Sequence, residues 1–389
     1  MALKLSRRHF TLGASALFLS GAMPTAPLSA PALAAPPSLS DHNISSRRLD
    51  MIAFGSCARQ DMDQPVWDSI AALEPDLFVF LGDTVYADTE NMDKMAADYE
   101  LLGKKPGFQA LRRGTPVIGI WDDHDYGVND GDKHYVMKQD ARNIFLDFFE
   151  EPANSPRRTR KGGIYTSYLF GPAGQRVHII LPDLRYERDR LPYGYTKEEF
   201  HKRVKMGYGP YRPLSDPSTR LMSETQWQWL EQELRRPAEI KIIGSSIQFV
   251  AATSGWEGWA QFPHERARLI RLINTTGAQS VFFISGDIHR GEFSLLPATK
   301  TGNIPTPAYP LWDFTSSGLK ASVYPGINPN HRRFNNLYYD RENFGLIYID
   351  WGLEDPQITA EIRNEDGQMV LQHSFRLNLL QHTSSKTKG

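Results

Sequence analysis

The sequence has very little cysteine, because Cys57 is the only one in 389 residues. An internal disulfide is therefore excluded, and so is a zinc site built from several cysteines. The net charge is only −1, so no nucleic-acid-binding module is expected from charge. The apolar run from Leu12 to Met23 is shorter than the ~20 residues that a membrane-spanning helix needs. We therefore expect no stable membrane span.

Several sequence motifs of enzymes are also missing. The chain has no Gly-x-Ser-x-Gly elbow, no P-loop, no Gly-x-Gly-x-x-Gly and no His-Glu-x-x-His. The first absence argues against an acyl hydrolase of the lipase type.

The N-terminus is typical of an export signal. Arg7-Arg8 is followed by Phe10, Leu12 and an apolar run, and a small-residue cleavage site follows at 32–35. The paired arginines predict a twin-arginine signal peptide at 1–35, with an ordinary Sec signal or a short anchor as alternatives. The partner would be the twin-arginine export machinery, and the protein would be periplasmic or secreted. That route carries folded proteins, often with a cofactor already loaded, which hints at a metal.

The rest of the chain predicts one α/β domain at 48–380, between a Pro/Ser-rich linker at 36–47 and a disordered tail at 381–389. Apolar runs alternate with amphipathic segments, and the C-terminal part is rich in strand patterns. The expected strands are 51–54, 77–81, 117–121, 165–170, 177–181, 240–245, 280–284, 311–315, 345–350, 357–363 and 368–376. The expected helices are 63–73, 92–102, 139–149, 223–234 and 264–274. Asp63 is expected to be the N-cap of the first of these helices, and Ser223 with Gln226 is expected to form a capping box at the start of the fourth. We expect a four-layer α-β-β-α sandwich, in which the β-rich end forms a second sheet packed on the first.

Polar clusters follow the apolar strands directly. They contain Cys57, the pair Asp83 and Tyr86, the run 122–125, Gln248, and the pair Asp287 and His289. Ligands of α/β sheets bind at the carboxyl ends of strands, so these side chains should meet at one edge. Carboxylate, phenolate, imidazole and thiolate groups are metal ligands, and two adjacent metals suit phosphoryl transfer. Alone, each aspartate is equally typical of a turn, and a free cysteine is commonly a buried apolar residue.

Together these clusters resemble the PhoD-like (alkaline phosphatase D) family of metallophosphoesterases. The motifs that carry the resemblance are Phe54-Gly55-Ser56-Cys57, Gly82-Asp83-Thr84-Val85-Tyr86, Trp121-Asp122-Asp123-His124-Asp125, Gln226-Trp227-Gln228-Trp229-Leu230, Gly286-Asp287-Ile288-His289 and Thr315-Ser316-Ser317-Gly318. The resemblance covers roughly residues 50–319 in order. It implies the metallophosphoesterase-type sandwich and hydrolysis of phosphate monoesters or diesters by metal-activated hydroxide.

The resemblance also implies a metal set, most naturally Fe³⁺ and Ca²⁺. Cys57, Asp83, Tyr86 and His289 would hold the iron. Asp83 would bridge to the second site, which Asp287 and either Asn129 or Asp123 would complete. Some members carry paired asparagines after the third motif, whereas Val128-Asn129-Asp130 holds one, so these last ligands stay open.

Two residues are candidates for catalysis. His124 stands where metallophosphoesterases place a histidine that protonates the leaving group or binds phosphate, although it could merely orient neighbouring carboxylates. Arg185 follows the strand 177–181 and is a candidate phosphate clamp. The alternative function is a non-catalytic exported metal-binding protein that recognises an anionic polymer.

Three further features have weaker interpretations. The loop-rich segment 185–221 holds five tyrosines and is interpreted as a flap on the substrate side. The tryptophans of Gly255-Trp256-Glu257-Gly258-Trp259 would either line the cleft or pack in the core. The basic runs 104–105, 112–113 and 157–161 are interpreted as solvated surface.

Overall fold

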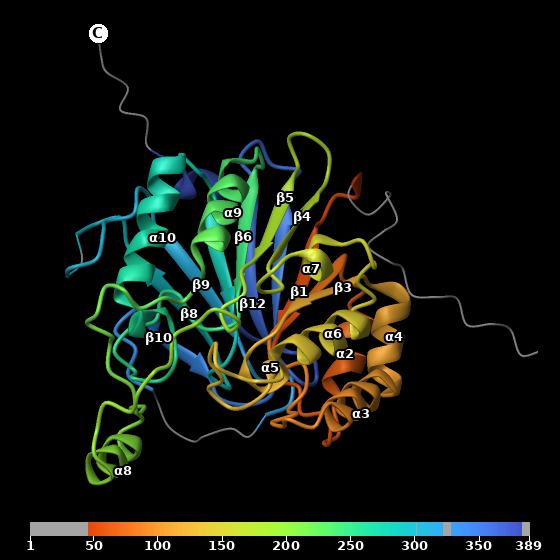
Figure 1. Ribbon diagram of the computed structural model, residues 1–389. Coiled ribbons are helices and arrows are strands. Elements are labelled where there is room, and N and C mark those ends of the chain that lie inside the picture. Colours follow the sequence, from red (N-terminus) through yellow and green to blue (C-terminus); the bar gives the residue numbers. More distant parts are fainter. Residues whose placement is uncertain (1–45, 301, 322–327, 383–389) are drawn as a thin grey trace, which may run out of the picture. The chain divides into compact units, whose positions relative to one another are not determined.

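Figure 1 shows the computed structural model, which describes residues 46–300, 302–321 and 328–382. The signal peptide predicted at 1–35 lies outside these residues, as do most of the predicted linker and tail. No helix in the described part of the chain is long and apolar enough to cross a membrane. In chain order the elements are β1 (Met51–Gly55), α2 (Val66–Ala72), β2 (Leu77–Leu81), α3 (Met92–Gly103), α4 (Pro106–Gly114), β3 (Val117–Ile120), α5 (Asp123–Tyr126), α6 (Lys138–Phe148), α7 (Pro156–Thr159), β4 (Thr166–Phe170), β5 (Val177–Leu181), α8 (Lys197–Lys205), α9 (Glu224–Arg235), β6 (Ile240–Ser245), η1 (Trp259–Gln261), α10 (Pro263–Thr276), β7 (Val281–Ser285), β8 (Gly291–Leu296), β9 (Leu311–Ser316), β10 (Arg333–Tyr339), β11 (Asn343–Asp350), β12 (Gln357–Asn364), β13 (Met369–Arg376) and η2 (Leu377–Leu380).

Two mixed sheets contain all of these strands. The six-stranded sheet has the order β13-β12-β11-β1-β2-β3, and the seven-stranded sheet has the order β10-β8-β9-β7-β6-β5-β4. Strands β1, β2 and β3 are parallel, as are β5, β6, β7 and β9. The predicted α-β-β-α class with two packed mixed sheets is therefore confirmed.

The β-rich end does not form a sheet of its own, and that detail of the prediction was wrong. Strand β11 pairs antiparallel with β1, with Met51 opposite Tyr348, so β11, β12 and β13 extend the first sheet. Only β8, β9 and β10 join the second sheet. The alternation of apolar residues identifies a strand but does not say which open edge it will pair with.

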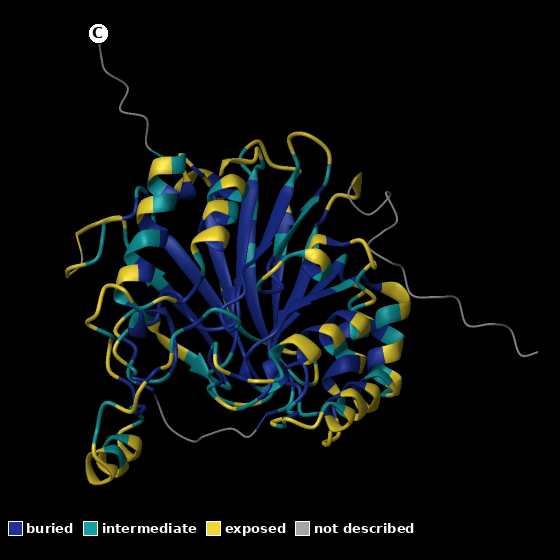
Figure 2. Ribbon diagram, in the orientation of Figure 1, coloured by how far each residue is buried: buried dark blue, intermediate teal, exposed yellow. Residues whose placement is uncertain are grey.

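Helices cover the outer faces of both sheets (Figure 1). Helices α2, α3, α4 and α6 lie against the six-stranded sheet, and α9 and α10 lie against the seven-stranded sheet. Figure 2 shows buried strands between helices whose outer faces are exposed. Between the sheets, the ring of Phe314 on β9 lies 6.2 Å from that of Phe375 on β13.

The helix on β2 illustrates how the sequence drives this packing. All five residues of β2 are buried, as expected for a strand covered on both faces. Trp67 of α2 packs on Phe78 and Phe108, with ring centroids 5.6 and 5.0 Å apart. Such aromatic contacts add to the free energy of burial and fix the helix on the sheet.

Three local expectations need correction. Helix α2 begins at Val66, because Asp63 accepts a hydrogen bond from the next residue instead of capping the helix. Ser223 caps α9, but Gln226 does not complete a capping box, because its side chain binds the backbone of Asp183 after β5.

Arg157 is not a surface residue, contrary to the interpretation of the basic run 157–161. Its guanidinium is buried and donates to the carbonyls of Ile164 and Gly119, both at 2.8 Å. It also pairs with Glu151 at 3.1 Å. Burial of this arginine is tolerated because its donors have acceptors.

Candidate active site

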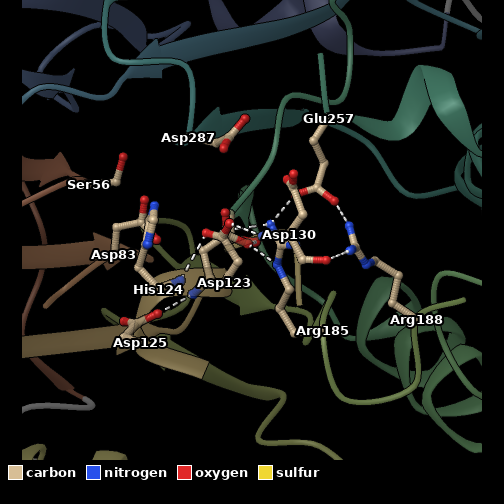
Figure 3. A network of polar contacts seen from close by, with 12 residues as sticks. Ser56, Asp83, Asp123, His124, Asp125, Asp130, Arg185, Arg188, Glu257 and Asp287 are labelled. Atoms are coloured by element: carbon tan, nitrogen blue, oxygen red, sulfur yellow. Dashed lines mark hydrogen bonds and ion pairs between the residues drawn. The ribbon is translucent and has the colours of Figure 1, made fainter. Parts of the chain in front are cut away.

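The carboxyl ends of the parallel strands of both sheets meet at one place (Figure 3). Cys57 follows β1, Asp83 follows β2, Asp123 opens α5 after β3, and Asp287 follows β7. Among the described residues, four groups have ligand atoms within 4.8 Å of one another. They are Cys57 with Asp83 and His289, Asp83 with Asp123 and His124, Asp122 with Glu257 and Asp287, and Asp123 with Asp130 and Glu257.

The first group brings together the residues expected at the first metal. The Sγ of Cys57 lies 3.3 Å from Oδ2 of Asp83, and both side chains are buried. The hydroxyl of Tyr86 lies 2.9 Å from Nε2 of His289, so the fourth expected ligand is next to the group. Cys57 and Asp83 are 26 positions apart in the chain, whereas Tyr86 and His289 are 203 positions apart.

The ligand-bearing turns have a tight backbone. Cys57, Asp83, Asp287 and His289 all have positive φ angles, of 63°, 49°, 74° and 53°. Residues other than glycine adopt this region at a cost, and such residues concentrate at functional sites. In this site the left-handed backbone sets the direction in which each of these side chains leaves the end of its strand.

Two glycines allow the strand ends to approach each other. A Cβ at Gly82 would lie 2.3 Å from Cβ of Asp122, and the φ of Gly82 is +95°. A Cβ at Gly286 would lie 2.5 Å from Oγ of Ser56 and 2.8 Å from the carbonyl of Leu81. Gly286 therefore permits the close contact between the two sheets from which Cys57 and Asp287 reach one site.

The ligand atoms of this site are suited to a bound cation. Oδ1 of Asp83 and Oδ2 of Asp122 are buried and have no hydrogen-bond partner among the described residues. Burial raises the pKa of Asp83 well above its usual value, and the nearby Cys57 and Asp123 raise it further. Burial likewise raises the pKa of Asp287, with Asp122 and Asp123 adding to it. Crowded carboxylates with open lone pairs are what a bound cation would stabilise.

Asp83 belongs to two groups at once. It lies with Cys57 and His289 on one side and with Asp123 and His124 on the other. A carboxylate shared in this way is the arrangement expected of a bridging ligand between two metals.

His124 is held on two sides. Its Nδ1 lies 2.7 Å from Oδ2 of Asp88, and its ring stacks on Tyr86 with centroids 4.1 Å apart. Burial opposes the positive charge, but the carboxylates of Asp123 and Asp83 outweigh it and raise the pKa of His124 to about 11. The same geometry lets His124 act either as a ligand beside Asp83 and Asp123 or as a donor to a bound substrate.

The region of the second expected metal site contains more acidic side chains than the sequence predicted. Asn129 is exposed, whereas the neighbouring Asp130 is half-buried and groups with Asp123 and Glu257. The amide of Asp130 donates to Oδ2 of Asp123 at 2.7 Å, which ties the 128–130 turn to α5. Asn129 stays a prediction, while Asp122, Asp130 and Glu257 were missed.

A signal for some of these missed residues was present. Asp122 and Asp123 are adjacent in the run after β3, so both could reach the edge. Glu257 lies in the glycine-containing loop Gly255–Trp259, of which the sequence interpretation considered only the tryptophans. Trp259 is in fact a core residue that donates to Ser245 at 3.1 Å, and Trp256 is half-buried.

Arg185 lies inside the acidic cluster. It is fully buried, its Nε lies 2.5 Å from Oδ1 of Asp122, and its Nη2 donates to Glu257. Burial opposes its charge, but Asp122 and Asp123 raise the pKa of Arg185 above its usual value. Its Nη1 is buried and has no hydrogen-bond partner among the described residues, so this donor is unsatisfied within the protein.

Arg188 adds a second buried guanidinium. It pairs with Glu257 and donates to the carbonyl of Asp130. Burial and the charge of Arg185 lower the pKa of Arg188 to about 10. Two arginines therefore offset part of the negative charge of the site, as Figure 3 shows.

Asp125 has a structural role in this motif. Its carboxylate accepts from the amide of Asp122 at 2.6 Å and from the amide of Thr84 at 3.0 Å. It thereby joins the ends of β2 and β3.

Fold and site together define a two-sheet α/β sandwich of the metallophosphoesterase type, with metal-ligand residues at the strand ends. A family model described as PhoD-like phosphatase matches residues 52–350. The chain therefore belongs to the PhoD-like phosphatase family and is a phosphoesterase, which confirms the resemblance found in the sequence.

Solved structures show the same fold. One described as "Structure of PhoD" matches with a TM-score of 0.65 and 16% identity, covering 88% of this chain and 73% of its own. Another, described as "GAP50 the anchor in the inner membrane complex of Plasmodium", matches with a TM-score of 0.51 and 11% identity, covering 85% and 90%. At such identities these likenesses concern the fold alone. No curated protein sequence matches the chain.

Proposed function

We propose that this protein is an exported, metal-dependent phosphoesterase that hydrolyses phosphate monoesters, diesters or both. The observation that carries the proposal is the double membership of Asp83, whose carboxylate lies in two adjacent groups of metal-ligand atoms. In the proposal, Cys57, Asp83, Tyr86 and His289 would hold Fe³⁺. Asp83, Asp287 and either Asp123 or Asn129 would hold Ca²⁺.

The bound ions would supply Lewis-acid stabilisation of the negative charge on phosphoryl oxygens. The chain's own residues then bind and orient the ester. Arg185 would donate from its unsatisfied Nη1 to a phosphoryl oxygen, while Asp122 and Glu257 hold its plane in place. Because that guanidinium is already fixed, little conformational entropy is lost when the anion binds.

His124 is proposed to donate a proton to the leaving-group oxygen. A carboxylate only accepts hydrogen bonds, so contact with Asp88 places a hydrogen on Nδ1 of His124. The stacking on Tyr86 fixes the ring plane, which leaves Nε2 to face the ester. A positioned acid of this kind contributes typically about 10²–10⁴-fold in rate.

The assignment is tested with p-nitrophenyl phosphate and its bis-ester, assayed with metal-replete protein from neutral to alkaline pH. Elemental analysis of the protein after export identifies the metals and their number. Hydrolysis together with two bound metals would support the proposal. A folded protein that binds metal but hydrolyses neither ester would contradict it and favour the alternative, a non-catalytic protein that recognises an anionic polymer.

Export by the twin-arginine route is part of the proposal. The double substitution Arg7→Lys and Arg8→Lys keeps the positive charge but removes the arginine pair. We expect the unprocessed precursor to accumulate inside the cell, as shown by immunoblots of cell fractions. Normal export of this variant would instead favour a Sec signal.

A further inference from the structure

The segment 190–212 beside the site has an unusual composition for this chain. It holds six arginine and lysine residues against two glutamates, and five aromatic residues. The whole chain, by contrast, carries a net charge of −1. Most of the segment was expected to be loop, but it contains α8, a helix with no buried residue.

An aromatic stack connects this segment to the acids of the site. Tyr211 is buried, and its hydroxyl donates to the carboxylate of Asp130. The ring of Tyr193 stacks on Tyr211, with centroids 5.7 Å apart and planes 14° from parallel. Tyr193 is nevertheless 71% exposed, which is unusual for a ring of this size.

Cationic groups lie next to Tyr195 in the same segment. The guanidinium of Arg203 lies 3.9 Å from the ring centroid of Tyr195, and that of Arg212 lies 4.3 Å from the same ring. Two guanidinium groups therefore lie over the ring of Tyr195, which is two residues after Tyr193 in the sequence. We call Tyr193, Tyr195, Arg203, Tyr211 and Arg212 the aromatic rim.

The rim is attached to the loop that supplies Glu257. The amide of Gly209 donates to Ser254, and the amide of Tyr211 donates to Gly255, each at 2.8 Å. The indole of Trp256 donates to the carbonyl of Gly207 at 2.9 Å. These hydrogen bonds fix the position of the rim relative to the loop that carries Glu257.

We propose that the aromatic rim binds the leaving group of the substrate, and that this group carries a planar aromatic ring and further negative charge, as a nucleotide does. This inference rests on the proposed phosphoesterase function. The ring would stack on Tyr193, and Arg203 and Arg212 would attract the additional anionic group. Stacking platforms with neighbouring cations bind bases of any sequence, because every base has a π face.

The test compares two phosphate monoesters in the metal-replete protein. Adenosine 3′,5′-bisphosphate has a leaving group with an aromatic base and a further phosphate, and glycerol phosphate has an aliphatic leaving group without charge. Tyr193→Ala should lower kcat/KM for the nucleotide by about 5- to 100-fold, mainly through KM, because base stacking is lost. Hydrolysis of glycerol phosphate should change little.

Two control variants accompany the substitution. Tyr193→Phe keeps the stacking face and should retain activity on the nucleotide. Met369→Ala truncates another exposed apolar side chain, on β13, and should leave both substrates unaffected. Equilibrium binding of adenosine 5′-monophosphate, followed by calorimetry, should weaken in Tyr193→Ala and not in Tyr193→Phe.

The outcomes separate the two proposals. If Tyr193→Ala affects both esters equally, or neither, the role of the rim is overturned while the phosphoesterase function stands. If the parent protein hydrolyses no ester at all, the proposed function fails. The binding measurement then still decides on the rim, because a nucleotide affinity that does not depend on Tyr193 would overturn it.

Discussion

At the scale of single residues, the site is built from side chains that would be unfavourable without a common ligand. Cys57 is a lone buried thiol, and burial raises its pKa to about 11 although Ser317 and Ser56 lie within hydrogen-bonding distance. Asp83 and Asp122 each keep a buried oxygen without a partner among the described residues. Such groups cost free energy in a core, so their presence at one edge is informative about function.

Replacing Cys57 with alanine should remove one metal and most of the hydrolytic activity while the fold survives. Loss of an outer-shell partner alone typically costs about 10- to 100-fold, so loss of a ligand should cost at least that much. The fold should persist because Cys57 forms no disulfide. Elemental analysis, ester hydrolysis and circular dichroism measure the three quantities, and an unchanged metal content would show that the thiol is only a core residue.

Gly286→Ala should disturb the site by a steric route. The new methyl group would lie 2.5 Å from Oγ of Ser56, so the strand ends of the two sheets must separate. We expect a loss of about 1–3 kcal/mol in the free energy of unfolding, together with reduced metal content. Gly114→Ala is the control, since a Cβ there meets nothing within 4 Å. Equal urea-unfolding curves for the two variants would contradict the expectation.

At the scale of elements, polar contacts fix the helices on the sheets in addition to apolar packing. Glu233 of α9 accepts from Ser167 of β4 at 2.8 Å and lies 3.0 Å from Nε2 of His178 on β5. Arg236 contacts the same carboxylate at 3.0 Å. One carboxylate thereby ties α9 to two strands of the seven-stranded sheet.

This contact gives a prediction for acid stability. Burial opposes ionisation of Glu233, but its contacts with His178 and Ser167 outweigh it and lower its pKa from 4.5 to about 2. The folded state therefore gains stability from ionised Glu233 above pH 4.5, and this gain is lost as the pH falls toward 2. The contribution is up to about 3 kcal/mol.

Glu233→Gln should reduce the free energy of unfolding at neutral pH, and the difference from the parent should shrink as the pH falls through this range. Urea unfolding at a series of pH values measures it. Glu231→Gln removes only an exposed ion pair with Arg235 and should have a small effect throughout. A pH-independent difference for Glu233→Gln would count against the ionised carboxylate as the cause.

At the scale of the whole molecule, the candidate metal site draws its residues from both sheets. Cys57 and Asp83 come from the six-stranded sheet, whereas Asp287 and His289 come from the seven-stranded sheet. A ligand that binds only the folded state stabilises it by mass action. Metal bound here should therefore stabilise the packing of one sheet on the other.

Removing metal with a chelator should lower the thermal unfolding midpoint, and adding metal back should restore it. At a metal concentration of ~100 times Kd the expected gain is about 2.7 kcal/mol. Scanning calorimetry measures the change. Cys57→Ala is the matched control, because its midpoint should respond less to chelation. An identical response in both proteins would place the stabilising ion elsewhere.

The amino-acid sequence alone was enough to predict the class of the fold. The buried strands were recognisable as apolar runs, and the rule that ligands bind at strand ends pointed to Cys57, Asp83, Asp287 and His289, whose roles as ligands stay predictions. The fold class could be predicted because the periodicity of apolar residues is a local property of the chain. The expected ligand types needed no knowledge of which strands are neighbours.

Which side chains meet depends on the long-range packing of the chain. The pairing of β11 with β1, the grouping of Asp130 with Glu257, and the burial of Arg185 between Asp122 and Glu257 all join distant segments. Nothing in a local pattern distinguishes a buried, paired arginine from one that faces solvent. That difference arises from long-range packing, which brings charges of opposite sign together where water is excluded.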